Sequence, residues 1–281
     1  MINIKNVTKE YGKMAAIDRF SLKLPEKGIY CLLGRNGAGK TTLLKMLVGH
    51  IAATDGDIFI DGKEISPSKM PESVNYIESG SVQFNMRVDE LIDTAAKLQD
   101  DFDRDFAQEM VERFELSRKK RFKQLSFGMK TMVTSIMSLA NNSKVVLLDE
   151  PTTGFDAIMR DQFNTLLLES YHANPRLIIV STHLIDEVAK VTERLIIIDK
   201  GKLLIEAGMD DIDEKAYTLS GSLAEVTPLL DNLNCIGKQI AGNVMAAHIY
   251  DERIQPPQGV AIGGLSLQDF FINIVGGRKN G

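Results

Sequence analysis

The chain has 281 residues, of which 44% are hydrophobic and 25% are charged, and this is the composition of an ordinary globular protein of one or two domains. Its formal net charge of −5 argues against a nucleic-acid binder, because such proteins normally carry a basic domain or stripe. Cys31 and Cys235 suggest neither a disulfide framework nor a metal site, and no apolar run approaches the ~18 residues that span a bilayer.

The first part of the chain predicts strands that lead into a glycine-rich turn. Residues 2–7 and 20–24 alternate between apolar and polar side chains, which indicates an antiparallel pair of strands. Residues 29–33 form an apolar run, and the turn that follows reads GRNGAGKTT over residues 34–42. Apolar side chains at helical spacing then predict a helix over residues 40–50.

The turn fits the P-loop pattern G-x-x-x-x-G-K-[ST]. Its glycines let the backbone curl so that amide groups point inward at phosphate oxygens, and the following helix adds its positive N-terminal end. Lys40 can reach the outer phosphates, and the hydroxyl of Thr41 can bind Mg²⁺. The nucleotide-binding residues predicted here are Gly34, Arg35, Asn36, Gly37, Ala38, Gly39, Lys40, Thr41 and Thr42.

The middle of the chain predicts a helical insertion and then alternating strands and helices. Residues 57–60 and 74–78 indicate short strands, and helical spacing among many charges indicates the insertion over about residues 86–128. Residues 131–140 begin a more apolar helix, and KVVLL at residues 144–148 is a continuous apolar strand. The later predicted elements are helices at 157–171 and 184–190 and strands at 177–180, 194–199 and 202–205.

This alternation predicts an α/β fold with a largely parallel sheet. In such sheets ligands bind at the carboxyl ends of the strands. Gly34, Asp149 and His183 each lie just past a predicted strand end. We therefore expect these three residues to converge on one site.

The chain after residue 208 predicts a second, small α+β domain. Its predicted elements are strands at 216–219, in the apolar runs on the two sides of Gly242-Asn243 and at 260–262, a helix at 223–233, and a last helix that Ser266 caps. The predicted domains are therefore residues 1–208 and residues 209–281.

Two acidic residues follow the strand at residues 144–148. Asp149 is placed to hold Mg²⁺ as the Walker-B carboxylate of P-loop ATPases does. Glu150 can orient and polarise a water for attack on a γ-phosphate. An acidic exit from a strand would be the simpler interpretation if the pair stood alone, but the P-loop upstream favours the catalytic one.

Several motifs in a fixed order point to one family. LSFG at residues 125–128, KVVLLDEPTTGFD at 144–156 and STH at 181–183 follow one another along the chain. The sequence resembles the nucleotide-binding subunit of an ABC transporter over about residues 2–208. This resemblance implies a P-loop NTPase core with a mostly parallel sheet, an antiparallel β subdomain and an α-helical subdomain.

The resemblance also implies roles for residues outside the P-loop. Ser126 and Gly128 belong to the LSGGQ motif, which contacts the γ-phosphate of ATP bound to the other subunit of a dimer. The serine hydroxyl and a helix N-terminus near Lys130 would make this contact. Asp156 matches the loop that couples the two subunits.

Two more residues are assigned in the same way. His183 matches the histidine that senses the γ-phosphate, so that the predicted catalytic residues are Glu150, His183 and Lys40. Tyr11 matches the aromatic residue that stacks on adenine, a contact worth roughly 1–3 kcal/mol.

The motif at residues 125–129 departs from the family pattern. It reads LSFGM, so that Phe127 replaces the first glycine of LSGGQ and Met129 replaces its glutamine. The serine and the second glycine have the phosphate-facing role, and we therefore expect function to survive.

The family's glutamine after the strand at residues 74–78 is also missing. The loop is one residue short, and Glu78 and Ser79 are the two candidates for the vacant role. With Glu78 included, the predicted metal ligands are Thr41, Asp149 and Glu78.

The resemblance implies an ATPase that binds ATP and Mg²⁺ and works as a head-to-tail homodimer or heterodimer. We expect it to power the export of a peptide, an antibiotic or a lipid through a separate transmembrane permease, at the cytoplasmic face of the membrane. The alternative is a soluble ABC ATPase scaffold of the Fe–S-assembly type. No nucleic-acid partner is predicted.

Overall fold

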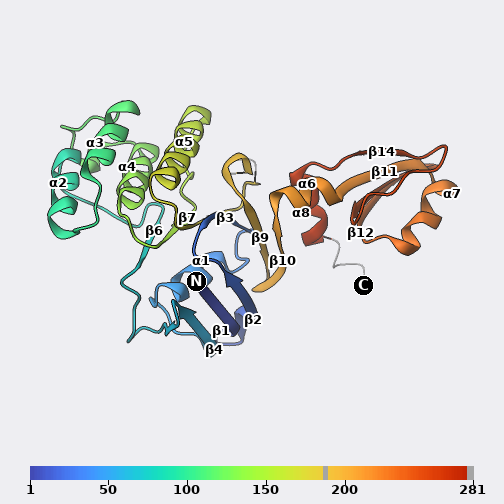
Figure 1. Ribbon diagram of the computed structural model, residues 1–281, viewed down its shortest axis with the longest axis horizontal. Coiled ribbons are helices and arrows are strands. Elements are labelled where there is room, and N and C mark those ends of the chain that lie inside the picture. The colour runs from blue at the N-terminus through green and yellow to red at the C-terminus, as the bar shows by residue number, and fades with distance from the viewer. Residues whose placement is uncertain (186–188, 277–281) are drawn as a thin grey trace. The chain divides into compact units, whose positions relative to one another are not determined.

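The computed structural model describes residues 1–185 and 189–276, and the chain divides into two units (Figure 1). The first unit contains residues 1–192 and 198–203, and the second contains residues 193–197 and the chain from Leu204 onward. The domain boundary at residue 208 stays a prediction. Among the described residues, no helix combines the length and the apolar character needed to cross a membrane.

An antiparallel sheet of order β2-β1-β4-β5 lies in the first unit. Its strands are β1 (Ile2–Tyr11), β2 (Met14–Leu24), β4 (Asp55–Ile60) and β5 (Lys63–Glu64). Alternation along β1 buries Ile2 and Ile4, and the pairing then shifts at a bulge where Asn6 has a φ of +48°. The predicted antiparallel pair is confirmed, although β2 begins at Met14 and not at residue 20.

A second sheet has the order β10-β9-β3-β8-β7-β6. Its strands are β3 (Gly28–Leu33), β6 (Val74–Glu78), β7 (Val145–Asp149), β8 (Leu177–Thr182), β9 (Arg194–Asp199) and β10 (Lys202–Gly208). Strands β3, β8, β7 and β6 are parallel, and every residue of β3, β7 and β8 is buried. Continuous apolar runs of this kind fit a sheet covered on both faces, and the predicted parallel sheet is confirmed.

The described helices of the first unit are α1 (Lys40–Leu47), α2 (Val88–Leu98), α3 (Arg104–Arg113), α4 (Phe127–Ala140) and α5 (Ala157–Ala173), with 3₁₀ turns η1 (Phe122–Gln124) and η3 (Ala189–Val191). The predicted insertion is α2 and α3, which lie beside α4 (Figure 1). Helix α4 begins at Phe127 and not at residue 131, because Ser126 caps it. The helix predicted at 184–190 falls partly on residues 186–188, which are outside the described residues.

Arg176, directly before β8, joins the ends of α4 and α5. Its side chain is only 3% exposed. The guanidinium donates to the carbonyls of Leu139 (2.7 Å), Ser170 (3.1 Å) and Asn174 (2.9 Å) and to Ser170 Oγ (2.7 Å). Leu139 and Ser170 lie in the last turns of α4 and α5, so the cation complements the negative ends of both helices. Burial lowers the pKa of Arg176 to about 10, and the group therefore stays charged at neutral pH.

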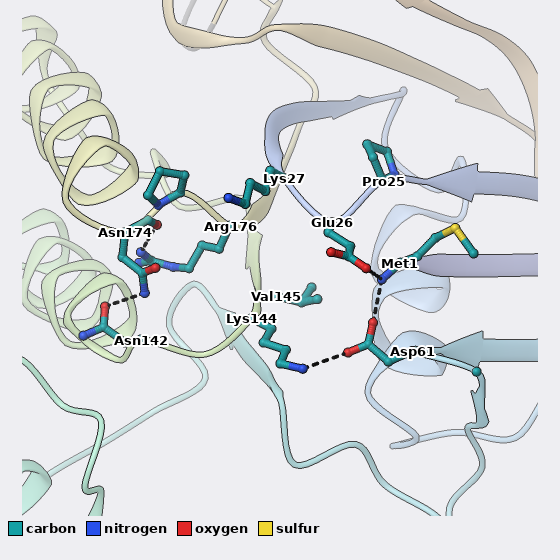
Figure 2. Close-up of a pocket in the computed structure, with 12 residues that line it drawn as sticks. Met1, Pro25, Glu26, Lys27, Asp61, Asn142, Lys144, Val145, Asn174 and Arg176 are labelled. Carbon is teal, nitrogen blue, oxygen red and sulfur yellow. Dashed lines mark hydrogen bonds and ion pairs between the residues drawn. The ribbon is translucent and has the colours of Figure 1, made fainter.

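Replacing Arg176 by methionine is expected to lower the Tm by about 5–10 °C, because buried carbonyls lose a charged donor worth ~2–4 kcal/mol. Lys27 lines the same pocket, of about 540 Å³, and is exposed (Figure 2). Lys27→Met is therefore the matched control. Thermal unfolding followed by circular dichroism measures both variants, and equal shifts would contradict a special role for Arg176.

The second unit contains an antiparallel sheet of order β12-β13-β11-β14. Its described elements are α6 (Met209–Lys215), β11 (Ala216–Ser222), α7 (Leu223–Val226), 3₁₀ turn η4 (Thr227–Asn232), β12 (Cys235–Ala241), β13 (Val244–Tyr250), β14 (Ala261–Gly264) and α8 (Leu267–Gly276). The helix predicted at 223–233 ends early, at Val226. Pro228 lies at the start of η4 and cannot donate a backbone hydrogen bond to continue the helix.

The predicted cap of the last helix is confirmed, since Ser266 Oγ accepts a hydrogen bond from the Asp269 amide at 3.0 Å. The core of this unit combines one face of the sheet with α7. It is formed by Tyr217, Leu219, Val226, Met245, Ala247, Ile249 and Val260.

Candidate active site

The glycine-rich turn joins the end of β3 to the start of α1. Gly37 and Gly39 have φ values of +79° and +110°, in the left-handed region that glycine adopts without strain. Gly34 is required for a different reason, because a Cβ atom there would lie 2.5 Å from the carbonyl oxygen of Ile198. The curled backbone and the helix start at Lys40 form the predicted strand–turn–helix unit, a typical oxyanion cradle.

Lys40 lies inside this turn and is only 6% exposed. Its ammonium donates to the carbonyl of Gly34 at 2.8 Å and lies 3.1 Å from Glu150 Oε1. A buried cation with a single carboxylate partner is well placed to receive a phosphate, because the phosphate can take over the role of that carboxylate.

Glu150 is held from two sides. Its Oε1 faces Lys40, and its Oε2 lies 2.9 Å from His183 Nδ1. The residue has a φ of +52°, a left-handed conformation that is uncommon for a glutamate. The amide of Glu150 donates to the carbonyl of Ser181 at 3.1 Å and to Ser181 Oγ at 3.2 Å. The carboxylate is therefore fixed at the mouth of the P-loop.

Asp149, the last residue of β7, is 1% exposed, and both of its carboxylate oxygens accept hydrogen bonds. Ser181 Oγ donates to Oδ1, and Tyr76 Oη donates to Oδ2 at 3.3 Å. Burial, together with the charges of Asp149 and Glu78, raises the pKa of Tyr76, so the phenol stays a donor. These two bonds orient the carboxylate.

The donor set fits Mg²⁺, which usually takes one or two carboxylates and completes its shell with water and substrate phosphates. Asp149 offers an oriented carboxylate, and Thr41 offers a hydroxyl in the first turn of α1. Among the described residues there is no cluster of three or more His, Cys, Asp or Glu side chains that could hold a metal ion by protein ligands alone.

Glu78 and Ser79, the candidates for the missing glutamine, lie next to this carboxylate but have other partners. Glu78 pairs in register with Asp149, and its carboxylate lies 2.9 Å from Lys45 Nζ on α1. The amide of Ser79 donates to the carbonyl of Asp149 at 3.1 Å, and its hydroxyl lies 3.4 Å from Thr131 Oγ1 on α4. The role of Glu78 as a metal ligand stays a prediction.

A pocket of about 460 Å³ opens over the P-loop. It is lined by Tyr11, residues 35–42, Glu150 and His183. Of the three residues expected to converge, His183 lines the pocket, whereas Gly34 and Asp149 are not among its lining residues. Tyr11 is half exposed, and Lys9 Nζ lies 5.2 Å from the centre of its ring. The other lining residues were not predicted: Met14, Ala15 and Ala16 belong to no motif, and Thr153 lies within the KVVLLDEPTTGFD motif at residues 144–156.

Ser126, Gly128 and Asp156 do not line this pocket in the same chain. Ser126 and Asp156 are exposed, and each caps a helix: Ser126 Oγ accepts from the Met129 amide (3.2 Å), and Asp156 Oδ1 accepts from the Met159 amide (2.9 Å). The hydroxyl proton of Ser126 is left to donate to another group.

Comparison with known proteins identifies the family. The sequence profile described as "ABC transporter" matches residues 17–153. The chain is 31% identical over 228 residues to the uncharacterized ABC transporter ATP-binding protein YhcH of Bacillus subtilis, covering 76% of this chain and 72% of that protein. The chain belongs to the family of ABC transporter ATP-binding proteins. It is therefore an ATPase of the ABC type, and the predicted family is confirmed.

Other ABC transporter proteins show the same similarity. The chain is 29% identical over 212 residues to the lantibiotic transport ATP-binding protein SrtF of Streptococcus pyogenes, covering 75% of this chain and 92% of that protein. A solved ATP-binding cassette, a dimer in a post-hydrolysis state with ADP and Pi, has a TM-score of 0.64 at 23% identity, covering 74% of this chain and 99% of that one. This structure confirms the predicted ABC ATPase fold.

Proposed function

We propose that this chain is the ATP-binding subunit of an exporter that moves a peptide, an antibiotic or a lipid through a separate transmembrane permease. The names of relatives support this class of cargo, since they include lantibiotic and bacitracin transport ATP-binding proteins. The observation that carries the proposal is the position of Glu150 between Lys40 and His183 at the mouth of the P-loop pocket. Residues 1–208 form the ATPase domain in this proposal, and residues 209–281 form an accessory domain.

Each residue in or next to the pocket has a proposed role in ATP binding or hydrolysis. Tyr11 stacks on the adenine, and the amides of residues 35–42 bind the phosphates with Lys40. Thr41 and Asp149 hold Mg²⁺, which supplies charge neutralisation at the phosphate oxygens when bound. Glu150 accepts a proton from the attacking water, and His183 orients this carboxylate and senses the γ-phosphate.

Two copies of the site are completed across a head-to-tail dimer. Ser126, which is exposed, and Gly128, which is buried, stand at the N-terminus of α4, where the Ser126 hydroxyl and the helix dipole favour an anion. We propose that this end meets the γ-phosphate of ATP bound by the other subunit, with Asp156 beside it. The second subunit is either another copy of this chain or a related ATPase.

The permease has a site on the helical insertion. A groove of about 290 Å³ lies between α2, α4 and β6, and it is lined by Asn75, Ile77, Phe84, Met86, Leu91, Thr94, Ala95, Leu98, Gln99, Phe102, Met137, Ser138 and Asn141. None of these described lining residues is charged, so the groove suits the apolar face of a short helix. Binding of this kind would hold the chain at the cytoplasmic face of the membrane.

Ala95→Asp is expected to reduce the amount of permease that co-purifies in detergent by about tenfold or more, because an unpaired carboxylate in an apolar groove is costly. Ala96→Asp, one residue further along α2 and outside the groove lining, is the matched control. ATP affinity should be unchanged in both variants. A wild-type chain that retains soluble partners alone would support the scaffold alternative and contradict the exporter.

A further inference from the structure

Phe127 replaces the first glycine of the LSGGQ motif, and its ring touches two loops that are far apart in the sequence. A Cβ atom added to Gly154 would lie 2.5 Å from Phe127 Cδ1, and one added to Gly80 would lie 3.1 Å from Phe127 Cε2. Gly80 follows β6, and Gly154 follows β7. One edge of the ring therefore rests on each loop, and neither loop leaves room there for a side chain.

The rest of the first turn of α4 makes contacts with the same two loops. Thr131 Oγ1 donates to the Phe127 carbonyl at 3.1 Å and lies 3.4 Å from Ser79 Oγ, in the loop after β6. A Cβ atom on Gly128 would lie 2.7 Å from the Gly154 carbonyl oxygen, in the loop after β7. The ring is thus part of a junction between three segments.

The loop after β6 leads to the proposed permease groove, and the loop after β7 carries the proposed catalytic residue Glu150. The loop after β6 runs on to Phe84 and Met86, which line the permease groove. The loop after β7 starts at Glu150 and ends at Asp156, the cap of α5. Phe127 lies between them, directly after Ser126. A glycine at position 127 would have no side chain to contact both the loop after β6, which leads to the groove, and the loop after β7, which carries Glu150.

We propose that Phe127 is a positioning residue that makes the loop after β6, the loop after β7 and the start of α4 move as one body. This inference rests on the proposed function and deepens it. A helix that seats in the groove displaces the loop after β6, and the ring passes this displacement on to the segments that carry Glu150 and Ser126. Phe127 itself does not line the P-loop pocket of its own chain, so nucleotide binding by that pocket does not depend on its ring.

Phe127 is 47% exposed, and removal of its ring should therefore cost little stability. In the full-length chain, Phe127→Ala is expected to lower the kcat of ATP hydrolysis about tenfold, which corresponds to ~1.4 kcal/mol. The KM for ATP should stay within about twofold and the Tm within about 3 °C. Phe127→Leu, which keeps a side chain over both glycines, should restore most of the kcat.

Met70 provides a matched control. Its Cγ would lie 3.1 Å from a Cβ atom on Gly49, another glycine with a left-handed φ (+73°), and Met70 is 60% exposed. Met70→Ala removes the same kind of contact away from the site and should leave the kcat unchanged.

A double-mutant cycle with Gly80→Ala tests the contact itself. The strain of alanine at a φ of +74° is common to both backgrounds and cancels, whereas the clash with the ring exists only when Phe127 is present. The loss of kcat on Gly80→Ala should therefore be smaller in the Phe127→Ala background. Additive losses, or a wild-type kcat in Phe127→Ala, would overturn the proposal. A wild-type chain without ATPase activity would instead count against the proposed function.

Discussion

Replacing Lys40 by alanine is expected to reduce ATP affinity by about 10²–10³-fold, because an ammonium that donates two charge-assisted hydrogen bonds to phosphates contributes ~3–4 kcal/mol. Lys40 is 6% exposed, and its Nζ donates to the Gly34 carbonyl at 2.8 Å, so the ammonium is fixed within the turn by the protein itself. Little ordering remains to be done on binding, and the loss on deletion should be correspondingly large.

Isothermal titration with a non-hydrolysable ATP analogue measures this effect. Lys63→Ala, on the exposed strand β5, is the control for a change of one positive charge and should bind normally. Circular dichroism should show an intact fold in both variants, since Glu150 keeps His183 as a partner when Lys40 is removed. Micromolar affinity retained in Lys40→Ala would count against the P-loop assignment.

The edge of the sheet that carries the site was predictable from local patterns. Buried parallel strands read as continuous apolar runs, and the residues that follow them meet at one edge; Gly34, Asp149 and His183 could therefore be placed together without any long-range information. The P-loop turn was predictable for the same reason, because its glycines and its flanking strand and helix are adjacent in sequence.

The contacts within the site were harder to predict from the sequence. The position of Glu150 between Lys40 and His183 depends on a left-handed backbone at Glu150, which no local preference of glutamate indicates. Arg176 is a further example, since its donation to the Leu139 carbonyl joins positions 37 residues apart. Long-range contacts of this kind depend on how helix ends pack, and periodicity carries no information about that.

The predicted bounds of two helices were wrong, because a single proline or cap residue can end or start a helix against the apolar spacing. The apolar spacing at 223–233 predicts one helix, but Pro228 ends α7 at Val226. The apolar spacing predicts that α4 starts at residue 131, but Ser126 Oγ accepts from the Met129 amide and caps the helix, which therefore begins at Phe127. Pro228 and Ser126 are both visible in the sequence, but the predicted bounds of these two helices follow the apolar spacing alone.

Replacing Glu150 by glutamine is expected to lower ATP turnover by about 10²–10⁴-fold, because the amide has the shape of the carboxylate but cannot accept a proton from water. ATP affinity should not fall, since Glu150 Oε1 lies 3.1 Å from Lys40 Nζ and competes with phosphate for that cation. The amide is a weaker competitor, and the variant should therefore bind ATP at least as tightly as the wild type. With binding preserved and cleavage stopped, the closed dimer should accumulate.

Two measurements on the same variant separate these effects. Steady-state phosphate release reports turnover, and size-exclusion chromatography with ATP reports the dimer, which should persist in Glu150→Gln and dissociate in the wild type as ATP is consumed. Glu64→Gln removes a carboxylate from an exposed ion pair with Lys69 (2.6 Å) and should behave as wild type in both assays. Unchanged hydrolysis in Glu150→Gln would remove Glu150 from the catalytic role. Lost hydrolysis together with lost ATP binding would instead show that the carboxylate organises the P-loop, because its contacts with Lys40 and His183 would then be needed to shape the pocket.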